Sequence, residues 1–245
     1  MAGDRLDMAL VERGLARSRA RARDAILRGA VTVDGATVTK PSATVRDDAV
    51  LAIDDPANRY VSRAALKLAA GFDRFGYDPA GRCALDLGAS TGGFTQLLLE
   101  RGARHVTAVD VGHSQLDDTL RDDPRVAALE GLNARDLTSS HLPHPITALV
   151  ADCSFISLKL ALPPALALVE PGAWGLFLVK PQFEVGRDGI GKGGIVRDEA
   201  AGEAAAADVH AWLDSQSGWT SDGLTPSPIS GGDGNREFLL GARKA

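Results

Sequence analysis

The feature that most constrains the fold is a regular alternation of short apolar runs with helical stretches between residues 83 and 180. The runs are CALDLG, HVTAVDVG, ITALVADC and WGLFLVK, and the stretches between them include GGFTQLLLERG and SLKLALPPALALV. Apolar runs that alternate with helices form a parallel sheet covered by helices on both faces. The sequence therefore predicts a doubly wound, Rossmann-like α/β domain.

The chain ahead of this domain has a different pattern, with two short helices and a hairpin. RLDMALVERGL has apolar residues at helical spacing and ends at Gly14, while RARARDAILRG follows Ser18, a favourable N-cap, and ends at Gly29. VTVDGATV alternates apolar and polar residues around Asp34-Gly35, a dipeptide typical of hairpin turns. This pattern predicts a small α+β module.

We expect the 245 residues to divide into this module over 1–57, a linker over 58–63 and the α/β domain over 64–245. No apolar run approaches the ~20 residues that span a bilayer, and the first residues lack the features of a signal peptide. A cytoplasmic protein with no membrane partner is therefore expected. Cys83 and Cys153 stand far apart without a metal-ligand spacing, which predicts two buried thiols.

Charge is distributed unevenly along the chain, whose net charge is -5. Residues 1–67 contain 12 Lys/Arg and 9 Asp/Glu, a balance of +3, and the remainder contains 15 and 23, a balance of -8. Six arginines lie between Arg13 and Arg28 with a single acid, Asp24. They include the start of a predicted helix, where positive charge opposes the helix dipole. A phosphate-binding surface and a solvated helix face both fit this cluster.

The stretch LDLGASTGGFT follows the first predicted strand of the α/β domain, where open parallel sheets bind ligands. Gly88, Gly92 and Gly93 allow the backbone to approach a ligand closely, and Ser90 lies between them. The spacing differs from that of dinucleotide-binding and P-loop motifs. Asp86 would repel a pyrophosphate but can bind an ammonium group, directly or through water.

A second acid narrows the choice of cofactor. Asp110 ends the next apolar run, 24 residues after Asp86, and is placed to accept hydrogen bonds from both hydroxyls of a ribose. The two acids together favour S-adenosylmethionine. The same stretch also fits the G-x-S-x-G elbow of hydrolases, with Ser90 as nucleophile, but that interpretation needs a late histidine. The only histidine after residue 144, His210, lies in the middle of a predicted helix.

Charged residues at the ends of the later runs are candidates for the chemistry. Asp152 and Lys180 end two predicted strands and would lie at the same edge of the sheet as the cofactor. Lys67, at the domain junction, and Glu237, on the last predicted strand, can complete a set of two lysines and two acids. Each of the four also fits an ordinary surface ion pair, above all Lys67 and Glu237.

The N-terminal module resembles the S4-type RNA-binding domain over about residues 4–53, through RLDMALVERGLARSRARARDAILRGAVTVDGATVTKPS. The stretches YVSRAALKL, DLGASTGGFT, VDVG, DCSFISL and LVKPQFEVG resemble the TlyA family, often labelled hemolysin A. Its members are ribosomal RNA 2′-O-methyltransferases in which an S4-type domain precedes an FtsJ-like (RrmJ-like) domain. The resemblance implies a Rossmann-like class I methyltransferase domain, completed by the hairpin of TSDGLTPSP and REFLLGARK, behind a small α+β RNA-binding domain.

The resemblance also implies roles for residues, carried over motif by motif. The Lys-Asp-Lys-Glu tetrad of FtsJ-like enzymes falls on Lys67, Asp152, Lys180 and Glu237. The S-adenosylmethionine site falls on Asp86, Gly88, Ser90, Gly92, Gly93 and Asp110, with Asn133 toward the adenine. RNA phosphates would be bound by Arg5, Arg17, Arg19 and Lys40. The chain departs from the family at Ala64 and Ala65, where a glycine is common.

These expectations amount to methylation of a ribose 2′-hydroxyl, on a cytidine of 16S or 23S ribosomal RNA. Lys180 would hold the hydroxyl and accept its proton, with no metal and no obligate protein partner. The glycine-rich residues 184–198 fit either a mobile loop over the substrate or an ordinary connection. Three alternatives remain: a base or protein N-methyltransferase, an inactive RNA-binding protein and a hemolysin, although no amphipathic or membrane-spanning segment supports the last.

Overall fold

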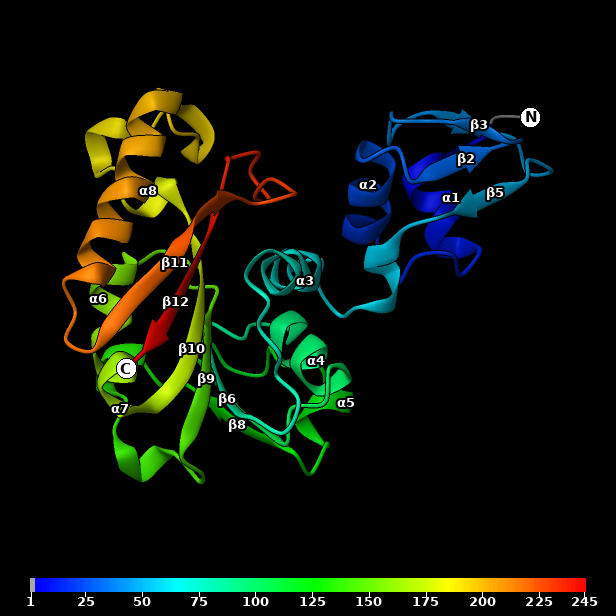
Figure 1. The fold of residues 1–245 in the computed structure, drawn as a ribbon. Coiled ribbons are helices and arrows are strands. Elements are labelled where there is room, and N and C mark those ends of the chain that lie inside the picture. Colours follow the sequence, from blue (N-terminus) through cyan, green and yellow to red (C-terminus); the bar gives the residue numbers. More distant parts are fainter. Residues whose placement is uncertain (1–2) are drawn as a thin grey trace. The chain divides into compact units, whose positions relative to one another are not determined.

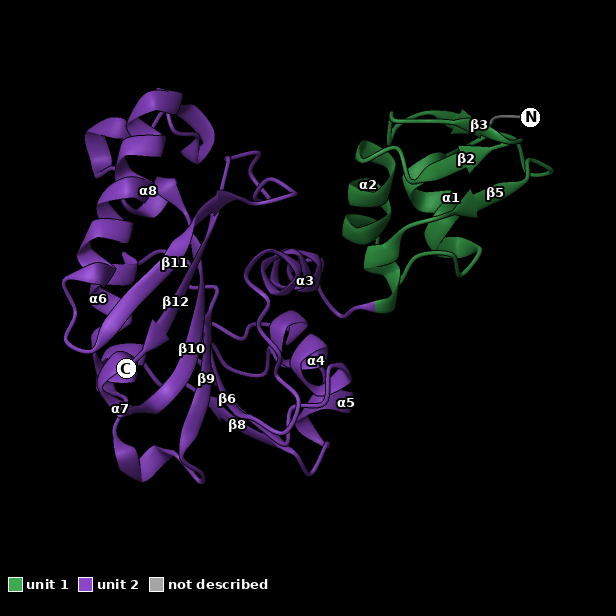
Figure 2. Cartoon of the chain, viewed as in Figure 1, with its two compact units in different colours: residues 1–59 green, residues 60–245 purple. Residues whose placement is uncertain are grey.

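The computed structural model describes residues 3–245 and divides the chain into two compact units, residues 1–59 and 60–245 (Figure 2). Each unit has a hydrophobic core of its own. Among the described residues, no helix combines the length and the apolar character that a bilayer crossing requires.

The first unit contains the predicted pair of helices and the hairpin (Figure 1). Ser18 caps the second helix by accepting a hydrogen bond from the amide of Arg21. Asp34 and Gly35 both have positive φ, of 50° and 81°, as the hairpin turn requires. Its elements are β1 (Asp4–Arg5), α1 (Leu6–Glu12), α2 (Arg19–Leu27), β2 (Val31–Val33), β3 (Ala36–Thr37), β4 (Thr44–Val45), β5 (Leu51–Ile53) and the 3-10 turn η1 (Pro56–Arg59).

The core of this unit lies between the two helices and the small sheets. Leu6 and Leu10 of α1 and Ala22 and Ile26 of α2 are fully buried, together with Val31 of β2. The strands pair in the orders β1-β4 and β3-β2-β5, all antiparallel. The exposed arginines of α2 therefore lie on a helix whose opposite face is fixed by apolar packing.

The second unit is built on a seven-stranded sheet in the order β11-β12-β10-β9-β6-β7-β8. The five strands from β10 to β8 are parallel, and β12 runs antiparallel to both of its neighbours. This is the predicted doubly wound sheet with a terminal hairpin. The strands are β6 (Cys83–Leu87), β7 (His105–Asp110), β8 (Val126–Glu130), β9 (Ile146–Ala151), β10 (Val169–Val179), β11 (Trp219–Pro226) and β12 (Phe238–Lys244).

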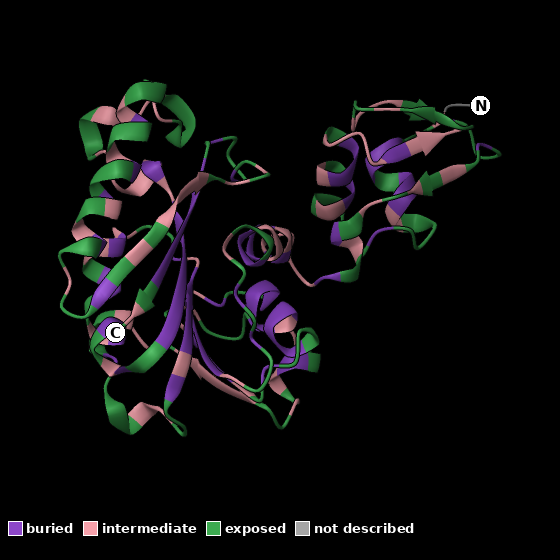
Figure 3. Cartoon of the chain, viewed as in Figure 1, coloured by how far each residue is buried: buried purple, intermediate pink, exposed green. Residues whose placement is uncertain are grey.

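Helices cover both faces of this sheet (Figure 1), and two separate apolar clusters fill the layers between helices and strands. The central strands β6, β7 and β9 and the later part of β10 are almost entirely buried (Figure 3), as expected for a parallel sheet. One face carries α3 (Ala64–Phe75), α4 (Gly93–Glu100) and α5 (Asp118–Arg121), and the other α6 (Leu158–Ala161), α7 (Pro163–Leu168) and α8 (Glu199–Asp214). Short 3-10 turns are η2 (Ala134–Asp136), η3 (Ser139–His141), η4 (Pro181–Phe183), η5 (Arg187–Gly189) and η6 (Lys192–Gly194).

Two details differ from the sequence-based expectation. The edge strand β8 was not predicted, although it contains the short apolar run VAAL; its residues are only partly buried because it lies at the edge of the sheet. The stretch SLKLALPPALALV forms two helices rather than one, because Pro163 and Pro164 occupy the first turn of α7. Cys83 and Cys153 are buried free thiols, as predicted.

Helix α3, which carries Lys67, packs closely on the sheet at Gly71, one turn further along the same helix. A Cβ atom at Gly71 would lie 2.4 Å from Cδ2 of Leu176 on β10, whose side chain is buried. We therefore expect Gly71→Ala to lower the free energy of unfolding by about 1–3 kcal/mol through overpacking, measured by chemical denaturation.

Gly202→Ala in α8 is the matched control. Its Cβ would meet neighbours at 3.5 Å, an ordinary contact, so the higher helix propensity of alanine should leave this variant as stable as the wild type or up to about 1 kcal/mol more stable. Equal effects of the two substitutions would contradict the close packing of α3.

Candidate active site

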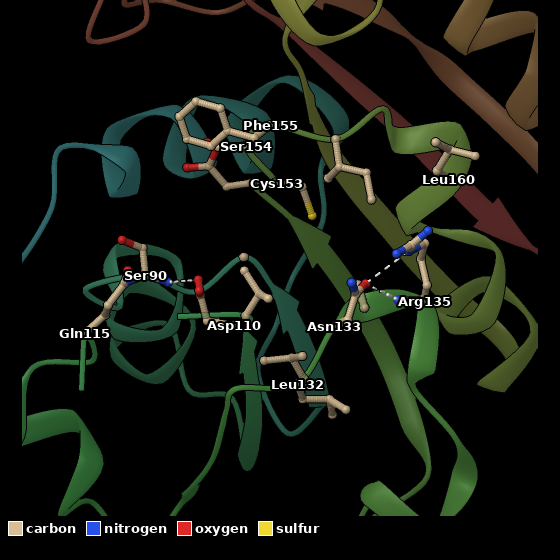
Figure 4. Close-up of a pocket in the computed structure, with 16 residues that line it drawn as sticks. Ser90, Asp110, Gln115, Leu132, Asn133, Arg135, Cys153, Ser154, Phe155 and Leu160 are labelled. Carbon is tan, nitrogen blue, oxygen red and sulfur yellow. Dashed lines mark hydrogen bonds between the residues drawn. The ribbon is translucent and has the colours of Figure 1, made fainter. Parts of the chain in front are cut away.

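A cavity of about 650 Å³ opens at the carboxyl ends of the parallel strands. Figure 4 shows that its walls come from the loops after β6, β7, β8 and β9. A second cavity of about 140 Å³ adjoins it and is lined by Gly93 and Lys180 among others. The two share four lining residues, Gly88, Ser90, Asp152 and Ser154. The predicted cofactor loop and part of the predicted tetrad therefore meet where the two cavities join.

The glycines of the loop after β6 serve different purposes. Gly88 has a φ of 78°, and a Cβ atom there would lie 2.7 Å from the carbonyl oxygen of Asp152, so the loop crosses directly over the end of β9. Gly93 begins α4, and a Cβ atom there would lie 2.8 Å from Cβ of Ser62. Gly92 packs against the side chains of Leu116 and Leu120 and lines neither cavity. Its role is packing, whereas Gly88 and Gly93 shape the cavities.

Asp86 lies at the end of β6, fully buried beneath the loop and outside the walls of both cavities. Thr95 Oγ1 donates a hydrogen bond to one carboxylate oxygen at 2.7 Å, and the other, Oδ1, has no hydrogen-bond partner. Burial raises the pKa of Asp86 to about 7. An orphaned acceptor in a polar site fits a cationic ligand that reaches it through water, as the sequence analysis allowed.

Asp110 ends β7 and lines the larger cavity. One carboxylate oxygen accepts the amide of Ser90 at 2.8 Å and the other the amide of Gly112 at 2.7 Å. The first bond holds Ser90 at a φ of 47°, a left-handed conformation that is uncommon outside glycine. Each oxygen keeps a second lone pair, so the geometry leaves room for the two ribose hydroxyls.

Glu130, at the end of β8, is a structural residue of the site that the sequence analysis missed. Its carboxylate accepts the backbone amides of Ser114, Gln115 and Leu116, and these bonds lower its pKa. The loop that it holds carries Gln115 into the cavity wall. An acid at a strand end was the available signal, but β8 itself was not recognised.

The wall of the larger cavity also contains Asn133 and an exposed aromatic residue, Phe155. Asn133 caps η2, because its Oδ1 atom accepts a hydrogen bond from the backbone amide of Arg135 at 3.0 Å. Its side-chain NH₂ group therefore remains available to a ligand in the cavity. Phe155 is 91% exposed, has a φ of 63° and packs against Phe183 with ring centroids 5.2 Å apart. The sequence analysis quoted Phe155 only as part of a motif. Its position on the cavity rim is a finding of the structure.

The four tetrad residues are arranged as two ion pairs. Lys180 Nζ lies 2.7 Å from Asp152 Oδ1 and donates a hydrogen bond to Ser154 Oγ at 2.8 Å. This pair lines the smaller cavity. Lys67 Nζ lies 2.5 Å from Glu237 Oε2, and both residues are buried, at 5% and 2% exposed. The structure thus brings Lys180 to the cavity wall and holds Lys67 and Glu237 in a buried link between α3 and the start of β12.

The predicted RNA-binding residues belong to the first unit. Arg5, Arg17, Arg19 and Lys40 are all exposed. Arg5 and Arg19 share one partner, the buried carboxylate of Asp7. The sequence analysis did not single out Asp7.

The hydrolase alternative finds no support. Among the described residues, no histidine lines either cavity around Ser90. His210 instead contacts Ser221 and Asp214, between α8 and β11. Ser90 therefore lacks a general base.

The raised pKa of Asp86 leads to a prediction about the free energy of unfolding. In the unfolded chain its pKa is near 3.8 and in the folded chain about 7, so ionisation disfavours the folded state. The contribution of this group to stability falls as the pH rises from about 4 to about 7. Asp86→Asn should be more stable than the wild type at pH 8, by up to about 4 kcal/mol, with the difference vanishing toward pH 4.

Denaturant titrations at several pH values test this. Asp118→Asn, which alters a side chain that is 89% exposed, should show no such trend. A difference between Asp86→Asn and the wild type that is the same at pH 4 and pH 8 would refute the raised pKa.

The buried pair makes a second prediction. Glu237→Ala leaves the Lys67 ammonium group buried without a counterion and should cost about 3–5 kcal/mol of unfolding free energy. Replacing both residues, as Lys67→Met with Glu237→Leu, should recover most of that loss. Glu199→Ala, which breaks an exposed pair with Arg236, is the control and should cost less than about 1 kcal/mol. A double variant no more stable than Glu237→Ala would show that the charges are not the cause.

Comparisons with known proteins agree with this architecture. The FtsJ-like methyltransferase family matches residues 60–244, and the S4 domain family matches residues 4–51. The chain is 45% identical to the 16S/23S rRNA (cytidine-2′-O)-methyltransferase TlyA of Mycobacterium tuberculosis, over 98% of this chain and 89% of that protein. It is 38% identical to Hemolysin A of Brachyspira hyodysenteriae, over 96% and 98% of the two chains.

A solved structure named as a hemolysin from Streptococcus thermophilus superposes with a TM-score of 0.76 at 38% identity, covering 100% of this chain and 90% of that one. The two-domain fold predicted from the sequence motifs is thus confirmed. The chain therefore belongs to the TlyA family of FtsJ-like methyltransferases, in which an S4 domain precedes the methyltransferase domain.

Proposed function

We propose that this protein transfers a methyl group from S-adenosylmethionine to the ribose 2′-hydroxyl of a cytidine in 16S or 23S ribosomal RNA. The observation that carries the proposal is the Lys180–Asp152 pair at the junction of the two cavities. A donor in the larger cavity and a ribose in the smaller one would meet beside this lysine. Membership of the TlyA family supports the same reaction and substrate. A ribosomal substrate also implies a cytoplasmic location.

The larger cavity suits S-adenosylmethionine. In this proposal Asp110 would bind the ribose hydroxyls, the amide of Asn133 would bind the adenine, and Asp86 would bind the amino group through water. Gly88 and Ser90 would bring backbone close to the cofactor, and Gly93 would do so from the adjoining smaller cavity. When bound, the cofactor supplies an electrophilic methyl group on a sulfonium centre.

The residues of the chain then have to orient the hydroxyl and remove its proton. The Lys180 ammonium group would first release a proton to solvent, and the resulting amine would hydrogen-bond the 2′-oxygen and accept its proton as the oxygen attacks the methyl group. Asp152 and Ser154 hold this nitrogen in place and stabilise the ammonium group that results. Lys67 and Glu237 would fix α3 against the start of β12. None of these steps assigns a role to a metal ion.

Recognition of the RNA is assigned to the first unit, with Arg5, Arg17, Arg19 and Lys40 as phosphate contacts. Such contacts fix the position of a folded RNA without reading its bases. Ribosomal RNA, either free or in a ribosomal subunit, is therefore the proposed partner, and no obligate protein partner is invoked.

Lys180→Ala tests the central role of the lysine. We expect methyl transfer to ribosomal RNA to fall by about 10²- to 10⁴-fold, while the dissociation constant for S-adenosylmethionine stays within a few-fold of the wild type. Labelled S-adenosylmethionine and alkaline hydrolysis check it, because a 2′-O-methylated nucleotide resists cleavage. Lys159→Ala, which removes a lysine paired with Asp208 on the outer helices, should retain full activity.

The same assay separates the alternatives. Alkaline cleavage that proceeds normally at the labelled nucleotide would point to a base methyltransferase. Label on protein alone would indicate a protein N-methyltransferase. An absence of label, with rRNA binding retained, would identify an inactive RNA-binding protein, and lysis of erythrocytes by the purified protein would revive the hemolysin.

A further inference from the structure

A buried carboxylate lies in the first unit, in the first turn of α1. Asp7 is 1% exposed although it carries a charge, and the neighbouring Leu6 and Leu10 are fully buried. Acidic side chains are almost never this buried unless they are paired. The partners of Asp7 therefore explain why it is there.

Those partners are two arginines from different elements. Arg5 of β1 donates through Nε and Nη2 to the two carboxylate oxygens, both at 3.0 Å. Arg19, the first residue of α2, donates through Nε at 2.9 Å. These bonds outweigh the effect of burial and lower the pKa of Asp7 to about 2, so the carboxylate stays ionised at neutral pH. One buried charge thus holds two arginines of separate elements together.

The bonds leave most of each guanidinium group available. A guanidinium group has five N–H donors. Arg19 uses one of them on Asp7, which leaves four, including both terminal nitrogens, and Arg5 uses two, which leaves three. The Arg19 side chain is 60% exposed and the Arg5 side chain 45% exposed. The remaining donors therefore lie at the surface, while the Nε atoms are fixed by Asp7. Two terminal nitrogens of an arginine match the geometry of a phosphate group.

The arrangement also accounts for the basic start of α2. Positive charge at a helix N-terminus opposes the helix dipole, and two nearby arginines repel each other. The negative charge of Asp7 offsets both effects without occupying the surface. An acid placed on the surface would neutralise the arginines too, but it would also repel an RNA phosphate.

We propose that Asp7 is a positioning residue for RNA recognition, which fixes Arg5 and Arg19 as a preformed pair of phosphate-binding groups. The inference rests on the proposed function, since it assumes that these arginines contact ribosomal RNA. Preorganisation strengthens binding because less side-chain entropy is lost when the RNA docks.

Asp7→Asn tests the inference through the sign of its effect. The substitution keeps the size of the side chain but removes one negative charge, which raises the net charge of the unit by one. If RNA were bound by charge attraction alone, the variant would bind RNA more tightly. Asparagine has one acceptor oxygen, and its NH₂ group faces guanidinium donors, so positioning predicts weaker binding, by about tenfold. The matched control is Asp47→Asn, an exposed acid of the same unit, with the same change of charge.

The measurement is the dissociation constant of the full-length protein for purified 16S and 23S rRNA and for ribosomal subunits, at one fixed salt concentration. Binding of Asp7→Asn as tight as that of Asp47→Asn, or tighter, would overturn the inference. Circular dichroism and the affinity for S-adenosylmethionine, which binds the other unit, should be unchanged.

Arg19→Lys provides a second test that leaves the buried acid in place. Lysine keeps the charge, but its three N–H donors share one nitrogen, so it cannot bind Asp7 through one nitrogen and present two others to a phosphate. We expect Arg19→Lys to weaken RNA binding nearly as much as Arg19→Ala, whereas Arg17→Lys, at an exposed arginine just before α2, should have a smaller effect. Wild-type affinity in Arg19→Lys, with a clear loss in Arg19→Ala, would overturn the positioning role.

Failure of the proposed function would look different. If Arg5→Ala combined with Arg19→Ala binds ribosomal RNA as the wild type does, then these arginines are not RNA contacts. If that double variant loses affinity while Asp7→Asn and Arg19→Lys do not, the contacts stand and only the positioning role of Asp7 is rejected.

Discussion

The candidate site depends on one close approach, that of Gly88 to the carbonyl of Asp152. Strands β6 and β9 are neighbours in the sheet, and the loop after β6 crosses the end of β9 with no room for a Cβ atom. This contact places the cofactor loop directly beside the residue that holds Lys180. A side chain at position 88 would clash with this carbonyl, so the loop and the end of β9, which line both cavities, could not keep their contact.

The two lysine–acid pairs differ in burial, and this difference indicates different roles. Lys180 and Asp152 line a cavity, so their charges can be used by a ligand. Lys67 and Glu237 are buried and connect segments 170 residues apart in the chain, so their main effect is to fix α3 against the start of β12. A mechanism in which Lys180 handles the proton and the other pair shapes its surroundings fits this division.

Carboxylates organise both units by accepting hydrogen bonds from loop amides or arginines. Asp110 and Glu130 hold loop amides around the larger cavity, and Asp7 holds two arginines of the S4 unit. Glu130 and Asp7 line neither cavity, whereas Asp110 also lines the larger one. In each case the negative charge of the acid fixes donors or loops before a ligand binds, which reduces the reorganisation required on binding.

The sequence by itself determined the layers, the two domains and the type of chemistry. Alternating apolar runs dictate a parallel sheet, and acids and glycines at strand ends are local signals, so Asp86, Gly88 and Asp110 could be found without a structure. Lys180 was recognisable for the same reason, because it ends an apolar run.

Only the tertiary structure decided how the side chains are partnered. That Gly92 packs rather than lines the cavity, that Lys67 is buried with Glu237, and that Asp7 joins Arg5 and Arg19 all depend on contacts between residues distant in the chain. The edge strand β8, and with it the role of Glu130, became recognisable only through its pairing with β7. Periodicity and motifs report the local conformational preference of a segment. The burial of a side chain and its hydrogen-bond and ionic partners depend on which distant segments the fold places next to it.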